Sequence, residues 1–234
     1  PTLGVGNTKD LGVGVHIKTA DSGASVNATA DELVIENSVH NGITLLTGTT
    51  QTSTINFGDS GDADIGIIEY NHNTDKMHIY AGAVNAMIID GTGAITKPLQ
   101  PCFFVYADSQ SGVGSGTTDI PFANERFDLN ADFSTPSFTA PVTGKYAFQM
   151  SVRIVNCQAG GDVSIYFQVS NAEIRAWRQD SDGDAGTYET ASASVVIDMD
   201  ANDTCKLQVN SSSDSDFIID GGTYSTYFSG YLVA

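Results

Sequence analysis

Basic residues are scarce in this chain of 234 residues, in which 10 lysines and arginines accompany 28 aspartates and glutamates. The formal net charge is therefore −18. Nucleic-acid backbones are bound by clustered lysine and arginine, so this composition argues against a nucleic-acid partner. An acidic surface instead favours solubility, salt tolerance or the binding of divalent cations. An assembly of three copies would carry three times this charge, −54, which salt or bound cations must screen.

No apolar run approaches the ~20 residues that a helix needs to cross a bilayer, so we expect no membrane insertion. The first residues also lack the apolar stretch of a secretory signal. The chain begins at Pro1 without methionine, and we expect a fragment of a longer protein or a processed product. Long helical patterns are missing too, whereas aromatic, β-branched and glycine residues are abundant, which predicts an all-β protein of one or two domains.

Catalytic groups are few in the second half of the chain. All four histidines precede residue 98: His16, His40, His72 and His78. A Ser-His-Asp or Cys-His arrangement within the last 130 or so residues is therefore excluded. The many carboxylates guarantee some pair suited to glycoside hydrolysis, so that feature carries no information. The lone Trp177 is expected to pack on the fold rather than to stack on a sugar, and we expect no enzyme.

The three cysteines, Cys102, Cys157 and Cys205, cannot form a closed disulfide framework because their number is odd. Buried free thiols are favoured, with a single disulfide as the alternative.

Acidic clusters raise the question of a calcium site, because Ca²⁺ prefers hard oxygen ligands. Asp180, Asp182 and Asp184 reproduce the opening spacing of a calcium loop, but Ala185 and Ala191 replace the glycine and the closing glutamate, which excludes an EF-hand. An improvised Ca²⁺ site on these three aspartates and a solvated acidic loop both remain open. The other clusters are Asp59/Asp62/Asp64 and Asp214/Asp216/Asp220.

The strongest periodicity in the chain follows the turn residues Pro141 and Gly144. From there apolar residues alternate with polar or small ones over ten positions, which predicts a long strand with one apolar face. The apolar set is Tyr146, Phe148, Met150, Val152 and Ile154. Residues 224–233, next to the C-terminal Ala234, alternate in the same way, so that Phe228 and Leu232 are expected to fill the core.

Two segments carry a family resemblance: residues 138–148 and the closing Ser225-Thr-Tyr-Phe-Ser-Gly-Tyr-Leu232. They resemble the globular head of complement subcomponent q and its relatives in the tumour necrosis factor superfamily, with Tyr227 inserted into the final motif. The resemblance covers residues 101–234 and implies a jelly-roll sandwich. On that fold the segment from Gly112 to Thr118 is expected to be a flexible loop.

The resemblance also implies a homotrimer, because in that family the inner sheet packs around a threefold axis. Tyrosine suits an interface, since its ring buries area while its hydroxyl finds a partner. Half-exposed tyrosines with no such role are the alternative. The interface candidates are Phe104, Tyr146, Tyr227 and Tyr231.

Residues 31–97 read as a series of short strands, each closed by Gly, Asn or Asp, at 32–36, 43–46, 54–57, 65–70, 76–80 and 86–90. Each strand is too thin to bury a face by itself, so stability requires other copies or stacking along an axis. The series resembles the repetitive region of phage tail fibres and spikes, notably in Gly66-Ile-Ile-Glu-Tyr-Asn-His72 and Met87-Ile-Ile-Asp-Gly-Thr-Gly93. That resemblance implies a trimeric β shaft, a virion location, and contacts to tail or capsid proteins through the N-terminal end.

The sequence thus predicts three parts: a thin β shaft over 1–97, a proline-bearing hinge over 98–101 and a jelly-roll head over 102–234. Alternating strand directions place the loops 107–118, 155–161, 179–187 and 211–222 at the end of the head far from the hinge. Loops on a rigid sandwich commonly bind ligands. The receptor-contact candidates are Ser109, Ser111, Asn156, Gln158, Asp180, Asp182, Asp184, Tyr188, Asp214 and Asp216.

The resulting hypothesis is a trimeric viral fibre or spike whose head binds a host-surface receptor, a glycan or another surface polymer or protein. A spike depolymerase that cleaves surface polysaccharide and a purely structural virion decoration protein are the alternatives.

Overall fold

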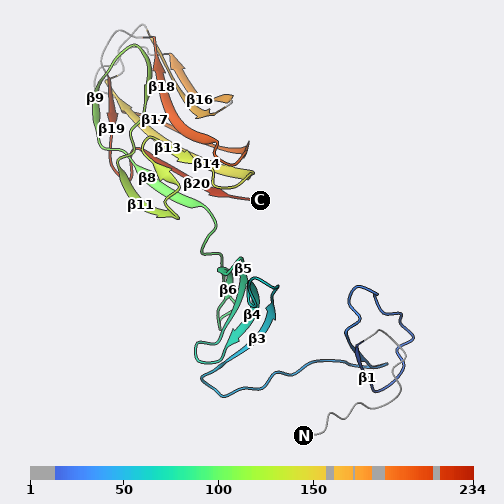
Figure 1. Cartoon of the computed structure of the whole chain (residues 1–234). Coiled ribbons are helices and arrows are strands. Elements are labelled where there is room, and N and C mark those ends of the chain that lie inside the picture. Colours follow the sequence, from blue (N-terminus) through green and yellow to red (C-terminus); the bar gives the residue numbers. More distant parts are fainter. Residues whose placement is uncertain (1–13, 157–160, 171, 181–187, 213–216) are drawn as a thin grey trace.

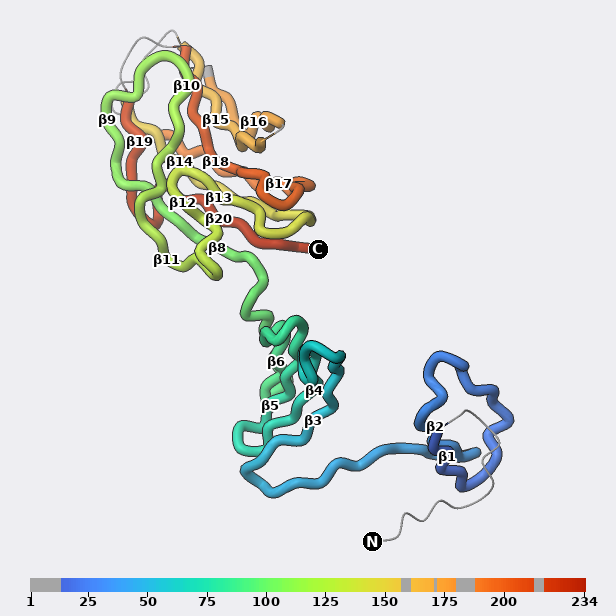
Figure 2. Tube along the Cα trace, in the orientation of Figure 1, coloured from blue at the N-terminus to red at the C-terminus, as the bar shows by residue number. Residues whose placement is uncertain are grey.

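The computed structural model describes residues 14–156, 161–170, 172–180, 188–212 and 217–234. The described chain consists of strands and turns, and three groups of strands follow one another from the N-terminus (Figures 1 and 2). The first group is the parallel pair of β1 (Val15–Lys18) and β2 (Leu33–Glu36). Within these residues no helix is long and apolar enough to cross a membrane.

The second group is a five-stranded antiparallel meander in the order β3-β4-β5-β6-β7. Its hairpins close at Asp75 and at Gly82-Ala83, all of which have positive φ. The predicted strand at 43–46 is wrong: this segment pairs with no strand, and its apolar side chains are exposed. The strands are β3 (Thr52–Phe57), β4 (Gly66–Asn71), β5 (Lys76–Ala81), β6 (Val84–Ile89) and β7 (Ile95–Thr96).

Residues 37–100 contain no buried residue, although the structure describes every one of them. Large apolar side chains stand in solvent along the whole segment, among them Leu46 at 89% and Phe57 at 57% exposure. A sheet that buries neither face cannot offset the entropy lost on ordering its strands. This part of a single chain therefore has backbone pairing but no core.

The third group is a sandwich of two antiparallel sheets formed by the second half of the chain (Figure 1). The larger sheet has the order β11-β8-β20-β14-β19-β9, and β17 pairs with the other side of β14. Its strands are β8 (Cys102–Tyr106), β9 (Gln110–Val113), β11 (Asn124–Leu129), β14 (Gly144–Val155), β17 (Tyr188–Met199), β19 (Phe217–Asp220) and β20 (Tyr227–Leu232).

The smaller sheet has the order β12-β13-β18-β15-β16, and β10 pairs with β18. Its strands are β10 (Gly116–Asp119), β12 (Phe133–Ser134), β13 (Ser137–Thr139), β15 (Asp162–Val169), β16 (Ala172–Asp180) and β18 (Thr204–Ser211). The predicted flexible loop from Gly112 to Thr118 is wrong, because β9 joins the larger sheet and β10 the smaller one. Pairing with existing sheet edges outweighs the low strand preference of these Gly and Ser residues.

The core lies between the two sheets and confirms the alternation predicted after Gly144. All five residues of the apolar set on β14 are at most 2% exposed, and Phe228 of β20 is 0% exposed. Phe228 forms the centre of an aromatic cluster, with its ring 5.0 Å from that of Phe103 and 5.6 Å from that of Phe148. Trp177 packs partly buried against this core, as predicted.

The rings of Phe103 and Phe148 explain why residue 230 of the closing motif is a glycine. A Cβ at this position would lie 2.5 Å from Cδ1 of Phe148 and 2.8 Å from Cε1 of Phe103. Both rings are fully buried and have no free space into which they can move.

We predict that Gly230→Ala lowers the free energy of unfolding by about 1–3 kcal/mol, because the added methyl group overpacks the core. Denaturant unfolding followed by tyrosine and tryptophan fluorescence measures the change. Ser229→Ala, one residue away and directed out of the core, serves as the control. Equal stability of Gly230→Ala and the parent protein would show that the rings of Phe103 and Phe148 can move aside without a loss of folding free energy.

Cys102 and Cys205 are free thiols, and Cys157 lies outside the described residues. Cys205 is 0% exposed, and burial raises the pKa of its thiol far above the ordinary value. Since the thiolate is the reactive form, a buried thiol of raised pKa is inert.

We predict that iodoacetamide at pH 8 leaves Cys205 unmodified in the native protein and modifies it fully in guanidinium chloride. Peptide mass spectrometry of the same sample in both conditions resolves the three cysteines. Rapid labelling of Cys205 in the native protein would contradict its place in the core.

Candidate functional site

The outer face of the larger sheet carries uncharged side chains in register across five strands. Directly paired residues of an antiparallel sheet share a face, so the pairing places side chains in rows. One row runs Val196, Ala147, Tyr231, Cys102, Leu129. Tyr231 is 45% exposed.

Two further rows continue this face toward the far end of the sandwich. They run Ser194, Gln149, Ser229, Phe104, Phe127 and Ser192, Ser151, Tyr227, Tyr106, Asn124. Phe104 stacks on Tyr227 at 5.1 Å between ring centroids and lies 6.2 Å from the ring of Phe127. These three rows, which we call the flat face, contain no charged residue in a chain of net charge −18.

Ion pairs bound the flat face at both ends along the strands. Lys145 Nζ lies 2.5 Å from a carboxylate oxygen of Asp198 at the end near the hinge. Arg153 pairs with Asp220 at the opposite end. An uncharged aromatic centre with a charged rim is the usual composition of a protein interface.

The outer face of the smaller sheet has the opposite character. Lys206 Nζ and Gln208 Nε2 donate to the carboxylate of Asp119 at 2.8 and 2.6 Å. Burial opposes ionisation of Asp119, but these two hydrogen bonds outweigh it and lower its pKa. Arg175 and Tyr166 lie together on the same face, with the guanidinium 5.4 Å from the ring centroid. The described polar residues of this face pair with one another, whereas the flat face of the same sandwich exposes apolar side chains.

Of the four predicted interface residues, Phe104, Tyr227 and Tyr231 lie on the flat face. The prediction for Tyr146 is wrong. Its side chain is 0% exposed in the core, and its hydroxyl donates to the carbonyl of Val142 at 2.7 Å. The strand period of two fixes this outcome, because Tyr146 shares its face with Phe148.

Sequence reasoning missed other members of the flat face, notably Phe127 and Val196. Both are exposed apolar residues. Val196 lies between the apolar Val195 and Ile197, so the sequence pattern does not show which way it points. Only the pairing of β11 with β8 and of β17 with β14 shows that the two residues share one surface.

The distal end of the sandwich, which we call the tip, gathers the ends of several strands. Val155 of β14 pairs with both Tyr188 and Ile218, whereas Cys102 pairs with Tyr231 at the opposite end. Strands β9 and β19 lie at the tip, away from the connection between the meander and the sandwich (Figures 1 and 2). The described strand ends at the tip therefore lie on the side of the sandwich opposite the meander.

Tyr188 is a large exposed side chain at the tip, at 66% exposure. The guanidinium of Arg153 lies 4.9 Å from its ring centroid and also pairs with Asp220. A rigid tyrosine backed by an arginine is typical of energetically important contact residues.

The remaining predicted contact residues divide into two groups. Ser109 and Ser111 are exposed, with the Ser109 hydroxyl accepting from Gly221 N at 3.0 Å, and Asn156 is half-buried with a φ of 63°. The others lie outside the described residues: Gln158, Asp182, Asp184, Asp214, Asp216 and the side chain of Asp180. The Ca²⁺ site proposed for Asp180, Asp182 and Asp184 therefore stays a prediction.

Nearby, Asp162 is held ionised at the tip. The Ser212 hydroxyl donates to its carboxylate, which, with the charge of Arg178, outweighs burial and lowers its pKa.

Elsewhere in the described ranges no group of three or more His, Cys, Asp or Glu side chains is placed to hold a metal ion. The carboxylate of Asp59 accepts from the backbone nitrogens of Gly61 and Asp62 at 2.7 and 3.0 Å, and these bonds lower its pKa. This aspartate closes a turn in the meander.

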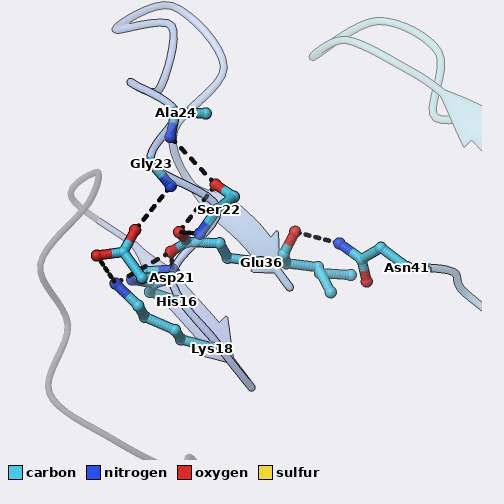
Figure 3. Close-up of polar contacts among 9 residues, drawn as sticks. His16, Lys18, Asp21, Ser22, Gly23, Ala24, Glu36 and Asn41 are labelled. Atoms are coloured by element: carbon cyan, nitrogen blue, oxygen red, sulfur yellow. Dashed lines mark hydrogen bonds and ion pairs between the residues drawn. The ribbon is translucent and has the colours of Figure 1, made fainter. Parts of the chain in front are cut away.

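The β1–β2 pair contains a buried cluster of charges (Figure 3). The carboxylate of Glu36 lies 2.9 Å from His16 Nε2 and 3.4 Å from Lys18 Nζ. Ser22 donates its backbone nitrogen and its hydroxyl to Glu36 at 2.7 and 2.9 Å. The backbone bond is the main cause that lowers the pKa of Glu36 to about 2, against the effect of burial. These contacts hold the loop that follows β1 against β2.

Comparison with known proteins identifies the sandwich. The C1q domain is the family whose model matches the chain, over residues 102–233. Similar solved structures include the globular domain of zebrafish complement 1qA protein, with 16% identity over 58% of this chain and 98% of that chain at a TM-score of 0.44. Murine APRIL at pH 5.0 has 9% identity over 57% and 99% of the two chains at 0.41. Eiger TNF from S. frugiperda has 11% identity over 57% and 94% at 0.37.

Comparison with curated proteins gives no match. The C1q match confirms the predicted all-β class with a jelly-roll sandwich in the second half. Because this match spans more than half of its residues, the chain belongs to the C1q domain family.

Proposed function

We propose that the chain is part of a homotrimeric viral fibre or spike, in which residues 1–97 form a shaft and the C1q head binds a receptor on the host surface. The observation that carries this proposal is the absence of any buried residue between 37 and 100, next to a head with an uncharged aromatic flat face. Both halves leave apolar surface that further copies of the chain can cover.

The exposed area of the chain supports association. The surface measures 13370 Å², whereas a compact monomer of this mass exposes about 10,000 Å². The chain therefore exposes roughly 3,000 Å² more than a compact monomer, and part of this surface is apolar.

The similarity of the short-strand series to phage tail fibres supports the virion location and the N-terminal contacts to other virion proteins. Membership of the C1q family supports the trimer. Three receptor sites on one stalk gain about 10²–10⁴-fold in avidity without any new contact. A weak tip contact to a surface glycan or protein is therefore sufficient for attachment.

The proposal assigns no catalytic role to the head, which has no histidine in its sequence. Two carboxylates at the tip are engaged by basic or hydroxyl partners: Asp220 by Arg153, and Asp162 by Arg178 and Ser212. Release of reducing sugar from host polysaccharide by the purified protein would contradict this assignment.

We predict that Tyr231→Asp abolishes the trimer, because three carboxylates would be buried in the flat faces of an already acidic assembly. Light scattering should show a fall from three times the 24.6 kDa of one chain to a monomer or an aggregate. Tyr224→Asp is the matched control, since Tyr224 is 91% exposed and lies off the flat face. A stable trimer of Tyr231→Asp would count against the interface.

We predict that Tyr188→Ala weakens binding of the full chain to host cells about 10- to 30-fold, the usual effect of removing a central aromatic contact, while the trimer persists. Tyr166→Ala on the polar outer face is the control and should bind as the parent does. Binding of fluorescent protein to intact host cells gives the measurement. Unchanged binding by Tyr188→Ala would show that the receptor does not contact this part of the tip.

A further inference from the structure

The five-stranded meander has two faces of opposite character, and its register defines both. Ile55, Ile68, Ile79 and Met87 pair successively from β3 to β6, so these four side chains lie on one face in a row across the sheet. Two rows flank it on the same face: Ser53, Tyr70, Met77, Ile89, Ile95 and Phe57, Gly66, Ala81, Val84. We call this set of residues the apolar face.

The opposite face carries mostly polar residues, together with Ile67, Tyr80 and Ile88. Thr54, Glu69, His78 and Ile88 form one of its rows, and Asn71 pairs with Lys76 in another. His78 Nδ1 lies 2.7 Å from Asn85 Nδ2 on this side. A sheet with one polar and one apolar face is the pattern expected when one side meets water and the other meets protein.

The apolar face has no cover within the described chain. Ile55 is 49% exposed, Phe57 57%, Ile68 38% and Ile95 60%. The strands of the meander pack chiefly against their neighbours in the same sheet, and neither β1–β2 nor the sandwich lies over it (Figure 1). Something outside the single chain must cover it for the meander to be stable.

We propose that the apolar face is covered by the same face of other copies of this chain, so that three meanders close into a prism with their isoleucine rows around the axis. This inference rests on the proposed trimer and adds the surface by which the shaft assembles. Sheets packed face to face lie about 10 Å apart, which lets these side chains interdigitate.

Charge favours a copy of this chain as the occupant. None of the residues of the apolar face is charged, whereas the chain has a net charge of −18. Two such chains repel at almost any other surface, but they can meet through this one without bringing carboxylates together.

Continuity with the head gives the second argument. A groove of about 380 Å³ lies at the neck, by which we mean the hinge residues 98–101, and is lined by Ile95 of the apolar face and by Cys102, Leu129 and Tyr231 of the flat face. Gln100 Nε2 donates to the carbonyl of Leu232 at 2.6 Å and ties the neck to the head. The apolar face and the flat face therefore meet at the neck, so that one interface can run through both.

The test compares two adjacent isoleucines of β4 that point to opposite faces. In the full chain, Ile68→Asp places a carboxylate on the apolar face, whereas Ile67→Asp places it on the polar face with the same loss of strand preference. We expect Ile67→Asp to remain trimeric and to keep the parent's resistance to protease over residues 52–96. Ile68→Asp should lose the trimer or become cleaved in this segment at least ten times faster.

Cross-linking provides a second readout that does not depend on a destabilising substitution. With a short bismaleimide, Ile68→Cys should give covalent dimers or trimers of the full chain in excess of the parent, and Ile67→Cys should not. A parent that is monomeric at micromolar concentration overturns the trimer and this inference together. A trimeric parent in which Ile68→Asp has no effect, or in which only Ile67→Cys cross-links, overturns the apolar interface alone and leaves the trimer standing.

Discussion

Burial of apolar surface divides this chain at Pro101, and every other feature depends on that division. Beyond this point the head packs aromatic rings against one another between two sheets, with Phe103, Phe148 and Phe228 almost completely removed from solvent. Before it, the meander forms regular hydrogen-bonded strands and yet buries nothing. Hydrogen bonding alone contributes little net free energy, so the two halves of the chain differ in whether they can fold as single copies.

The two outer faces of the head show how composition distributes surfaces between solvent and partners. On the outer face of the smaller sheet the polar side chains form hydrogen bonds with one another, as Asp119 does with Lys206 and Gln208. The larger sheet has tyrosine, phenylalanine, serine and valine in the corresponding outward positions and places its ion pairs at the rim. In a strongly acidic chain such an uncharged surface requires that acidic residues be kept away from it, and the meander repeats the same arrangement on its apolar face.

The sequence predicted those features that depend on local pattern. The alternation after Gly144 identified a strand and its buried side, and the spacing of turn residues located most strands of the meander. Features that depend on pairing were not predictable. Tyr146 was assigned to an interface although its own alternation places it inside, segment 43–46 has strand-like residues but no partner, and residues 112–118 form strands because two sheet edges are available. The flat face needed the register of five strands, which no single stretch of sequence contains.

The place of β8 in the larger sheet determines how the head transmits force. This strand continues directly from the neck and is flanked on both sides, by β11 and by β20. In antiparallel pairs the hydrogen bonds run perpendicular to the strands, so tension applied along β8 loads them in shear and all at once rather than one after another. Tension applied between residues 98–101 and the sandwich would therefore meet its strongest mechanical resistance where β8 enters the larger sheet.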